Sequence, residues 1–252
     1  MIRTKWIVVL GVIAVLGFAI ATLPASVLAG RVEKHGVSAS SWNGSIWSGS
    51  ARDLAFRGRS LGTARWSISP WSLLSARLAG HAALSPDDGN VEADFSLSFA
   101  GRADLANVNI DLPLDSPAFH GLAPQGWTGR VQGHLDTLGL QDGWPVAALG
   151  TVDIVDIVAP PPRGAAMGGY RLSFPDPSAP TDTGDDLEAA LTDLDGPLSV
   201  NGHLRLANDR SYELEGHVSR KGTASTALDR AIEMLGPPDA SGRRPFGLSG
   251  TF

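Results

Sequence analysis

The chain has 252 residues with no cysteine, 30 glycines, 17 prolines and 18% charged residues, and its formal net charge is −6. This length allows one large or two small domains with a sizeable core, which argues against general disorder. Without cysteine there is no disulfide framework, no cysteine-ligated zinc, no iron–sulfur cluster and no thiol nucleophile. An acidic chain without clustered cations also makes nucleic acid a poor partner, because phosphate binding depends on positive charge.

An uncharged apolar run extends from Trp6 to Leu23, behind Arg3 and Lys5. Extended to residue 28, it is long enough for a helix to cross the roughly 30 Å hydrocarbon core of a bilayer. We expect a transmembrane anchor over 6–28, with residues 1–5 in the cytoplasm and residues 31–252 exported to the other side of the membrane. A cleaved signal peptide is the alternative, since Val27-Leu28-Ala29 before Gly30 offers the small residues preferred at a cleavage site.

The rest of the chain alternates polar and apolar residues with a period of two, which is typical of half-buried strands. This alternation runs through 198–206 and 212–218, on both sides of the turn signal Asn208-Asp209, and predicts a hairpin. Further strands are predicted at 51–56, 61–66, 76–84, 94–100, 103–112, 129–135, 148–158 and 169–174. We therefore expect a mainly β fold with a long antiparallel sheet.

Glycines recur between apolar neighbours in these strands, at Gly80, Gly101, Gly133, Gly202 and Gly216. Alternation places each one on the apolar face, where glycine lets a sheet coil sharply. The sheet is therefore expected to be strongly curved, with its apolar face inward. That face is either filled by the protein's own side chains or open to a lipid chain.

Two short helices are predicted beside the sheet. The first covers 69–74, where Ser69 is a candidate cap and Pro70 occupies the first helical position. The second covers 223–235 and stops at Gly236-Pro237-Pro238. Its apolar stripe should pack on the sheet and consists of Ala224, Ala227, Leu228, Ala231, Ile232 and Leu235.

The negative charge is concentrated between Leu172 and Leu204, where there is no Lys or Arg and the acids are Asp176, Asp182, Asp185, Asp186, Glu188, Asp193 and Asp195. Prolines and a glycine interrupt the same stretch. We expect a solvated, flexible acidic loop over 175–196. A calcium site is the sharper alternative, although the acids lack the spacing of an EF-hand loop.

No catalytic motif is present in the sequence. It contains no G-x-S-x-G elbow, P-loop or dinucleotide fingerprint, and no HxH or HExxH spacing of metal ligands. The histidines that follow repeat glycines fall on the polar face of separate strands and are His81, His134, His203 and His217. Asp153 and Asp156 should point to opposite faces of one strand, which does not suit paired acid–base chemistry. We predict a non-enzymatic protein with no catalytic, cofactor-binding or metal-binding residues.

Tryptophans gather just after the apolar run. Trp42, Trp47, Trp66 and Trp71 lie within 30 positions of one another, and Trp127 follows further on. Tryptophans at this density are usually core plugs or interface anchors, so these five are the candidate interaction or core-anchor residues. Core packing is the simpler interpretation, while Trp42 and Trp47 are also near enough to the run to lie at the level of lipid headgroups.

Several motifs follow the apolar run in a fixed order. The first are Trp42-x-Gly44-x-x-Trp47-x-Gly49, Ala64-Arg65-Trp66-Ser67-x-Ser69-Pro70-x-x-Leu73-Leu74, Gly126-Trp127-x-Gly129 and Asp142-Gly143-Trp144-Pro145. The later ones are Asp195-Gly196-Pro197-Leu198, Asn208-Asp209-Arg210-Ser211-Tyr212, Leu235-Gly236-Pro237-Pro238-Asp239 and Gly242-Arg243-Arg244-Pro245-Phe246. In this order they resemble the protein N family of the bacterial type II secretion system.

The resemblance implies a non-enzymatic, single-pass component of the inner membrane, with a cytoplasmic N-terminus and its bulk in the periplasm. Such a component takes part in exporting folded proteins across the outer membrane. Its implied partners are the outer-membrane secretin and the inner-membrane platform, and exposed sheet edges could accept a partner strand. An anchored lipid-binding or lipid-transfer protein with an apolar groove is the alternative, and an assembly factor for an outer-membrane partner is a third possibility.

Overall fold

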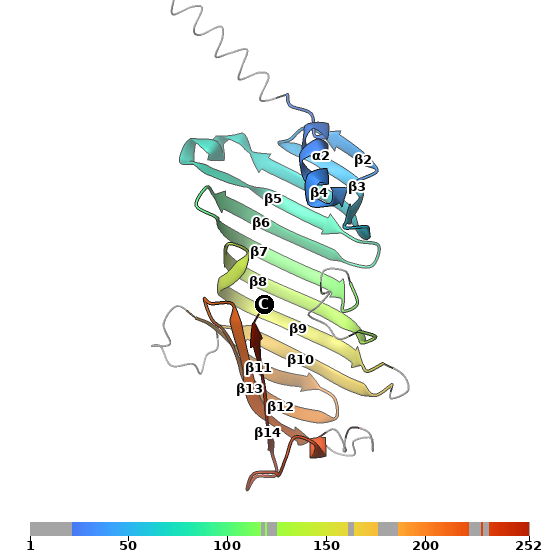
Figure 1. The fold of residues 1–252 in the computed structure, drawn as a ribbon, viewed down its shortest axis with the longest axis vertical. Coiled ribbons are helices and arrows are strands. Elements are labelled where there is room, and N and C mark those ends of the chain that lie inside the picture. The colour runs from blue at the N-terminus through green and yellow to red at the C-terminus, as the bar shows by residue number, and fades with distance from the viewer. Residues whose placement is uncertain are drawn as a thin grey trace, which may run out of the picture. The chain divides into compact units, whose positions relative to one another are not determined.

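The computed structural model describes residues 22–116, 119, 125–160, 164–175, 186–221, 228 and 232–251. The chain divides into two compact units, residues 1–87 (unit 1) and residues 88–252 (unit 2). Both are built from antiparallel strands (Figure 1). The expected mainly β, antiparallel fold is confirmed.

Unit 1 contains a small antiparallel sheet in the order β1–β3–β4–β5, with β2 also paired to β3. Its described elements are α2 (Ser26–Val32), the 3₁₀ helix η1 (Glu33–His35), β1 (Val37–Ser38), β2 (Ser41–Gly44), β3 (Ser48–Phe56), β4 (Arg59–Ser69), the 3₁₀ helix η2 (Pro70–Ser75) and β5 (Arg77–Ser85).

Unit 2 is a meander in which each strand pairs with the next. Its strands are β6 (Asn90–Ser98), β7 (Arg102–Pro113), β8 (Thr128–Gln141), β9 (Trp144–Val158), β10 (Ala166–Phe174), β11 (Leu187–Asp195), β12 (Leu198–Leu206), β13 (Ser211–Arg220) and β14 (Arg244–Thr251). Figure 1 shows these strands side by side in chain order.

Alternation gives the sheet of unit 2 one apolar and one polar face. Cross-strand partners therefore form rows of one character. Ile110, Gly133 and Val152 are successive partners on the apolar face of β7, β8 and β9, and Asn109, His134 and Thr151 form the next row, on the polar face. Buried apolar residues of β7 and β8 lie on the same face as Ile110 and are Val108, Leu112, Val131 and Leu135.

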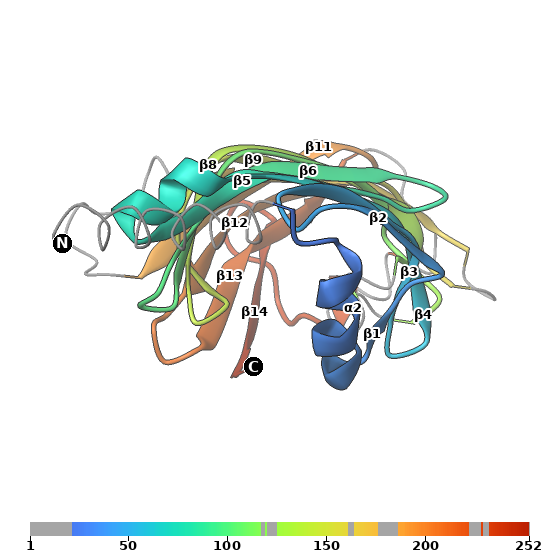
Figure 2. The ribbon, with the colours of Figure 1, turned by 90° about the horizontal axis from the view of Figure 1, so that it is seen from above.

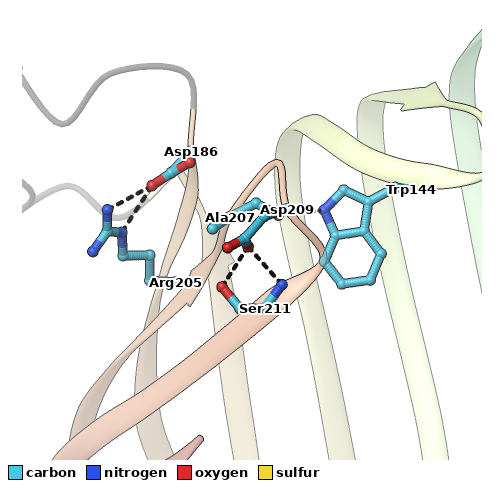
Figure 3. A network of polar contacts seen from close by, with 6 residues as sticks. All are labelled: Trp144, Asp186, Arg205, Ala207, Asp209 and Ser211. Carbon is cyan, nitrogen blue, oxygen red and sulfur yellow. Dashed lines mark hydrogen bonds and ion pairs between the residues drawn. The ribbon is translucent and has the colours of Figure 1, made fainter. Parts of the chain in front are cut away.

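The sheet of unit 2 bends between β9 and β12. In a flat sheet these strands, three steps apart, would be separated by about 14 Å. Yet Trp144, at the start of β9, donates a hydrogen bond from its indole Nε1 to the carbonyl oxygen of Ala207, just after β12, at 2.9 Å (Figure 3). Figure 2 shows β13 and β14 turned out of the plane of β6, β8 and β9. The bend brings together two of the motifs quoted above, 142–145 and 208–212.

Two glycines allow β12 and β13 to approach closely at the bend. Gly202 and Gly216 are directly paired, and Gly216 is also paired with Phe246 of β14. A Cβ atom added to Gly216 would lie 2.4 Å from the carbonyl oxygen of Asn201 and 2.7 Å from the Cα of Gly202. No side chain fits there, which explains glycine at this position in the repeat.

The main hydrophobic cluster of unit 2 lies on the apolar face of β12 and β13. Leu198, Val200 and Val218 pack with Leu228 and Ile232, and the flanking residues are Met167, Tyr170, Leu191 and Phe246. At these strands the inward face is filled by the protein's own side chains. This is the arrangement that the simpler interpretation of the glycine repeat predicted.

The strands predicted from periodicity are all present, and some other expectations need correction. Gly101 lies in the turn between β6 and β7 with φ +82°, not on the apolar face of a strand. The acidic loop expected over 175–196 was predicted to extend too far. Leu187–Asp195 form β11, in which Leu187 and Ala189 are buried. Residues 176–185 lie outside the described residues.

The predicted helices are only partly described. The helix expected at 69–74 is the 3₁₀ helix η2. Most of the helix expected at 223–235 lies outside the described residues, where Leu228, Ile232 and Glu233 are helical. The short helix α2 was not predicted as a separate element.

The anchor expected over 6–28 is wrong in its last part. Residues 1–21 lie outside the described residues, while Leu23, Pro24 and Ala25 interact with the β2–β3 turn instead of continuing one helix, and α2 begins at Ser26. Within the part of the chain that the structure describes, no helix has both the length and the apolar character needed to cross a membrane.

Candidate interaction surfaces

The segment before α2 is built into the sheet of unit 1. The carbonyl oxygen of Leu23 accepts a hydrogen bond from the N–H of Ile46 at 3.0 Å, and the N–H of Ala25 donates to the carbonyl oxygen of Gly44 at 3.0 Å. Pro24 forms a β-bridge with Ser45, and Ala25 is only 1% exposed. The chain therefore enters unit 1 at the β2–β3 turn.

Two of the candidate tryptophans hold this turn in place. The indole Nε1 of Trp66 donates a hydrogen bond to the carbonyl oxygen of Ile46 at 3.1 Å. Its ring packs against Trp42, with 6.0 Å between the ring centroids. Trp66 also covers Gly49, where an added Cβ would lie 2.6 Å from its Cζ2 atom. Trp42 and Trp66 thus connect two of the quoted motifs by packing.

The remaining candidate tryptophans differ in exposure. Trp47 and Trp127 are half-buried. The carbonyl oxygen of Trp47 accepts a hydrogen bond from the N–H of Ile68 on β4. Trp71, on η2, is 78% exposed. The structure therefore brings Trp42 and Trp66 together at the β2–β3 turn and places Trp71 on the surface.

The polar face of unit 2 carries a ladder of ion pairs and amide contacts around a shallow hollow of about 430 Å³. Arg130 donates two hydrogen bonds to Asp111, and Arg171 donates two to Asp153 at 2.6 and 2.7 Å. The hydrogen bond from Arg130 lowers the pKa of Asp111. His134 contacts Asn109 across the hollow, with 2.7 Å between Nδ1 and Oδ1. These contacts link neighbouring strands and rigidify the sheet.

A second hollow, of about 420 Å³, lies on the same face where side chains are small. Ala106, Gly139 and Ala147 form its floor, and Arg102 and Asp104 pair at its rim at 2.8 Å. Polar side chains such as Asn109, Gln132 and His134 line much of the first hollow, whereas apolar atoms form most of the lining of the second.

Asp193 joins β11, β12 and the segment after β13. Its carboxylate accepts hydrogen bonds from the N–H of Val200 at 2.8 Å, from the hydroxyl of Ser199 and from the ammonium group of Lys221. Burial alone would raise the pKa of Asp193, but the hydrogen bonds from Lys221 and Val200 outweigh it and lower the pKa. The neighbouring Tyr170 has a raised pKa, first because it is buried and second because Asp193 is negatively charged.

The last strand, β14, forms one edge of the sheet in unit 2. β13 pairs with one side of β14 from Arg244 to Thr251, and no described strand pairs with the other side. Pro245 is compatible with an edge position, because proline has no backbone N–H to donate and is confined in sheets mainly to edge strands. Leu248 is 58% exposed there. An edge with free backbone groups is the part of a sheet that can accept another strand.

Among the described residues, no three His, Asp or Glu side chains are grouped to hold a metal ion. The described contacts of the motifs quoted in the sequence analysis instead stabilise turns and strand pairs. Arg243 pairs with Asp239 at 3.1 Å, and Arg244 donates to the carbonyl oxygen of Gly236. Asp209 accepts hydrogen bonds from the hydroxyl and the N–H of Ser211 at 2.6 and 2.9 Å, next to the Arg205–Asp186 pair (Figure 3).

These features define a mainly β protein whose antiparallel strands are joined by tryptophan, glycine and arginine contacts at their turns. A family model described as type II secretion system (T2SS), protein N matches residues 35–247. The chain belongs to this family and is a component of the type II secretion system. Neither the curated proteins nor the solved structures give a match.

Proposed function

We propose that this protein is a non-enzymatic inner-membrane component of the type II secretion system that supports export of folded periplasmic proteins through contacts with other components. The family match over residues 35–247 carries this proposal.

The proposed topology has a single anchor that begins near Trp6 and ends before the sheet of unit 1. The uncharged run Trp6–Leu23 and the preceding Arg3 and Lys5 support a cytoplasmic N-terminus. Residues 31–252 would then lie in the periplasm. Because the carbonyl oxygen of Leu23 accepts a hydrogen bond from Ile46 of unit 1, unit 1 would follow the anchor directly.

The contact proposed for unit 2 is the addition of a partner strand to the free edge of β14. Backbone N–H and C=O groups would supply affinity, and the exposed Leu248 would supply an apolar contact. The partner would be the outer-membrane secretin or a protein of the inner-membrane platform.

Site-specific photocrosslinking in the producing bacterium tests this proposal. A benzophenone amino acid at Leu248 of the full chain should crosslink to the secretin or to a platform protein. The same amino acid at Phe99, which is 81% exposed in the β6–β7 turn, is the matched control and should give little of that product. Crosslinks from position 248 only to proteins outside the secretion system would contradict the proposal.

A further inference from the structure

The 3₁₀ helix η2 of unit 1 turns its apolar side chains away from the protein. Trp71 is 78% exposed, Leu73 42% and Leu74 82%, and η2 contains no buried residue. Ser72, in contrast, is half-buried, donates a hydrogen bond to the carbonyl oxygen of Ser69 at 2.6 Å and accepts one from the N–H of Ala79 on β5 at 3.0 Å. A polar side chain fastens η2 to the sheet and leaves the apolar ones free, the reverse of ordinary amphipathic packing.

This apolar surface lies at the end of unit 1 where the chain enters it. The carbonyl oxygen of Leu23 accepts a backbone hydrogen bond from Ile46 in the β2–β3 turn. The carbonyl oxygen of the next residue, Trp47, accepts one from Ile68 of β4. β4 ends at Ser69, and η2 begins at the following residue. Leu23, at the end of the apolar run, and η2 therefore lie at the same end of the unit 1 strands, with the β2–β3 turn between them.

The charges near η2 suit an anionic surface. Between Leu54 and Pro86 the sequence contains no Asp or Glu. Arg65 on β4 and Arg77, the first residue of β5, are exposed. Tryptophan and leucine flanked by arginine are typical of segments that lie at the boundary between lipid headgroups and acyl chains.

We propose that η2 is a second membrane contact, in which Trp71, Leu73 and Leu74 enter the headgroup region of the bilayer beside the anchor. The inference rests on the proposed function, which supplies the anchor. Insertion of η2 fixes unit 1 on the membrane surface at two points, so that the strands rise from the bilayer in one orientation. A single anchor leaves unit 1 free to rotate about its attachment.

The absence of native cysteine allows a direct test by spin labelling. The full chain with Leu74→Cys, labelled with a nitroxide, is reconstituted in vesicles of phosphatidylethanolamine and phosphatidylglycerol without other proteins. Ser60→Cys is the matched control, since Ser60 is exposed and lies about 30 Å away along β4. Ser75→Cys gives a second position on η2 if the change at Leu74 disturbs the fold.

We expect oxygen, which concentrates in the bilayer, to relax the labels at 74 and 75 more strongly than a water-soluble nickel chelate. At position 60 the nickel chelate should be the stronger relaxant. Labels at 74 and 75 that are as accessible to nickel as the label at 60, in chains that float with the vesicles, would overturn the η2 contact while leaving the anchor intact. Chains that do not float with the vesicles would contradict both the η2 contact and the membrane anchor.

Discussion

The carbonyl oxygen of Leu23 accepts a hydrogen bond from the N–H of Ile46 at 3.0 Å, which joins the end of the uncharged run to the first turn of the sheet. Together with the bond from Ala25 to Gly44, it makes the residues before α2 part of the fold of unit 1. Leu23, the last residue of the uncharged run, is consequently held against the sheet.

Removal of residues 22–29 should destabilise unit 1. A chain beginning at Gly30, as a signal peptidase would leave it, loses both backbone hydrogen bonds and the buried Ala25, at a cost of about 1–3 kcal/mol. A chain beginning at Thr22 keeps these contacts and equally lacks the apolar run. Urea unfolding followed by tryptophan fluorescence compares the two. Equal urea midpoints for the two chains would show that residues 22–29 contribute nothing to the stability of unit 1. If these residues belong to the fold, we also expect the protein isolated from its host to be uncleaved at Gly30.

The two kinds of tryptophan should respond differently to substitution. Trp66→Phe keeps most of the ring but removes the indole donor to Ile46, which should cost about 1 kcal/mol. Trp71→Phe, at a side chain 78% exposed, should leave the free energy of unfolding unchanged within about 0.5 kcal/mol. Thermal unfolding of the full chain in detergent measures both, and a Trp71 variant as unstable as the Trp66 variant would refute this assignment of roles.

Glycine should be required at position 216 and dispensable at 247. Gly216→Ala forces a methyl group against Asn201, Gly202 and Phe246, and relief of these contacts should cost about 1–3 kcal/mol. At Gly247, on the neighbouring strand, an added Cβ meets no atom within 4 Å. Gly247→Ala should therefore be neutral within about 0.5 kcal/mol. Chemical denaturation of both variants provides the comparison, and equal effects would show that β12 and β13 are not packed as closely as the structure indicates.

Periodicity found the strands because each one buries a single face. β11 escaped prediction because Glu188, Asp193 and Asp195 gave it the composition of a loop. In the structure, Leu187 and Ala189 supply its buried face, and Asp193 is neutralised by Lys221, which is 28 positions away. A partner so distant in sequence leaves no local signal.

The sites were harder to predict than the strands. Trp66 and Trp71 are five positions apart and equally apolar, yet one is packed against Trp42 and the other is exposed. Their roles depend on the end of β4, where the strand stops and η2 turns outward. The contact between Trp144 and Ala207 likewise depends on the bend of the sheet, which the glycine repeat indicated without giving the residues that meet.

Loss of the carboxylate at position 193 should destabilise unit 2. Asp193→Asn removes the ion pair with Lys221 and weakens the bonds from Val200 and Ser199, and the expected loss is about 1–3 kcal/mol at neutral pH. Asp104→Asn is the control, because the Arg102–Asp104 pair is exposed and such pairs contribute about 0–1 kcal/mol. Urea unfolding at pH 7 should separate the two variants, and the same small loss in both would contradict the role given to Asp193.

The contribution of Asp193 should also depend on pH. Because its pKa is lower in the folded state than the ordinary value of 3.8, its stabilising effect is fully present above pH 3.8 and is lost as the pH falls through the folded pKa. The difference in unfolding free energy between the wild-type chain and Asp193→Asn should shrink on acidification below pH 3.8. A difference that stays constant down to the acid transition would show that the carboxylate is not stabilised by charge.

The most direct test of the central claim is the amount of type II substrate released into the medium by a strain that lacks this chain. We expect the substrate to accumulate folded in the periplasm, and export to return when the full chain is supplied in trans but not when residues 1–21 are removed from it. Unchanged export in the deletion strain, with the rest of the secretion system intact, would contradict the account.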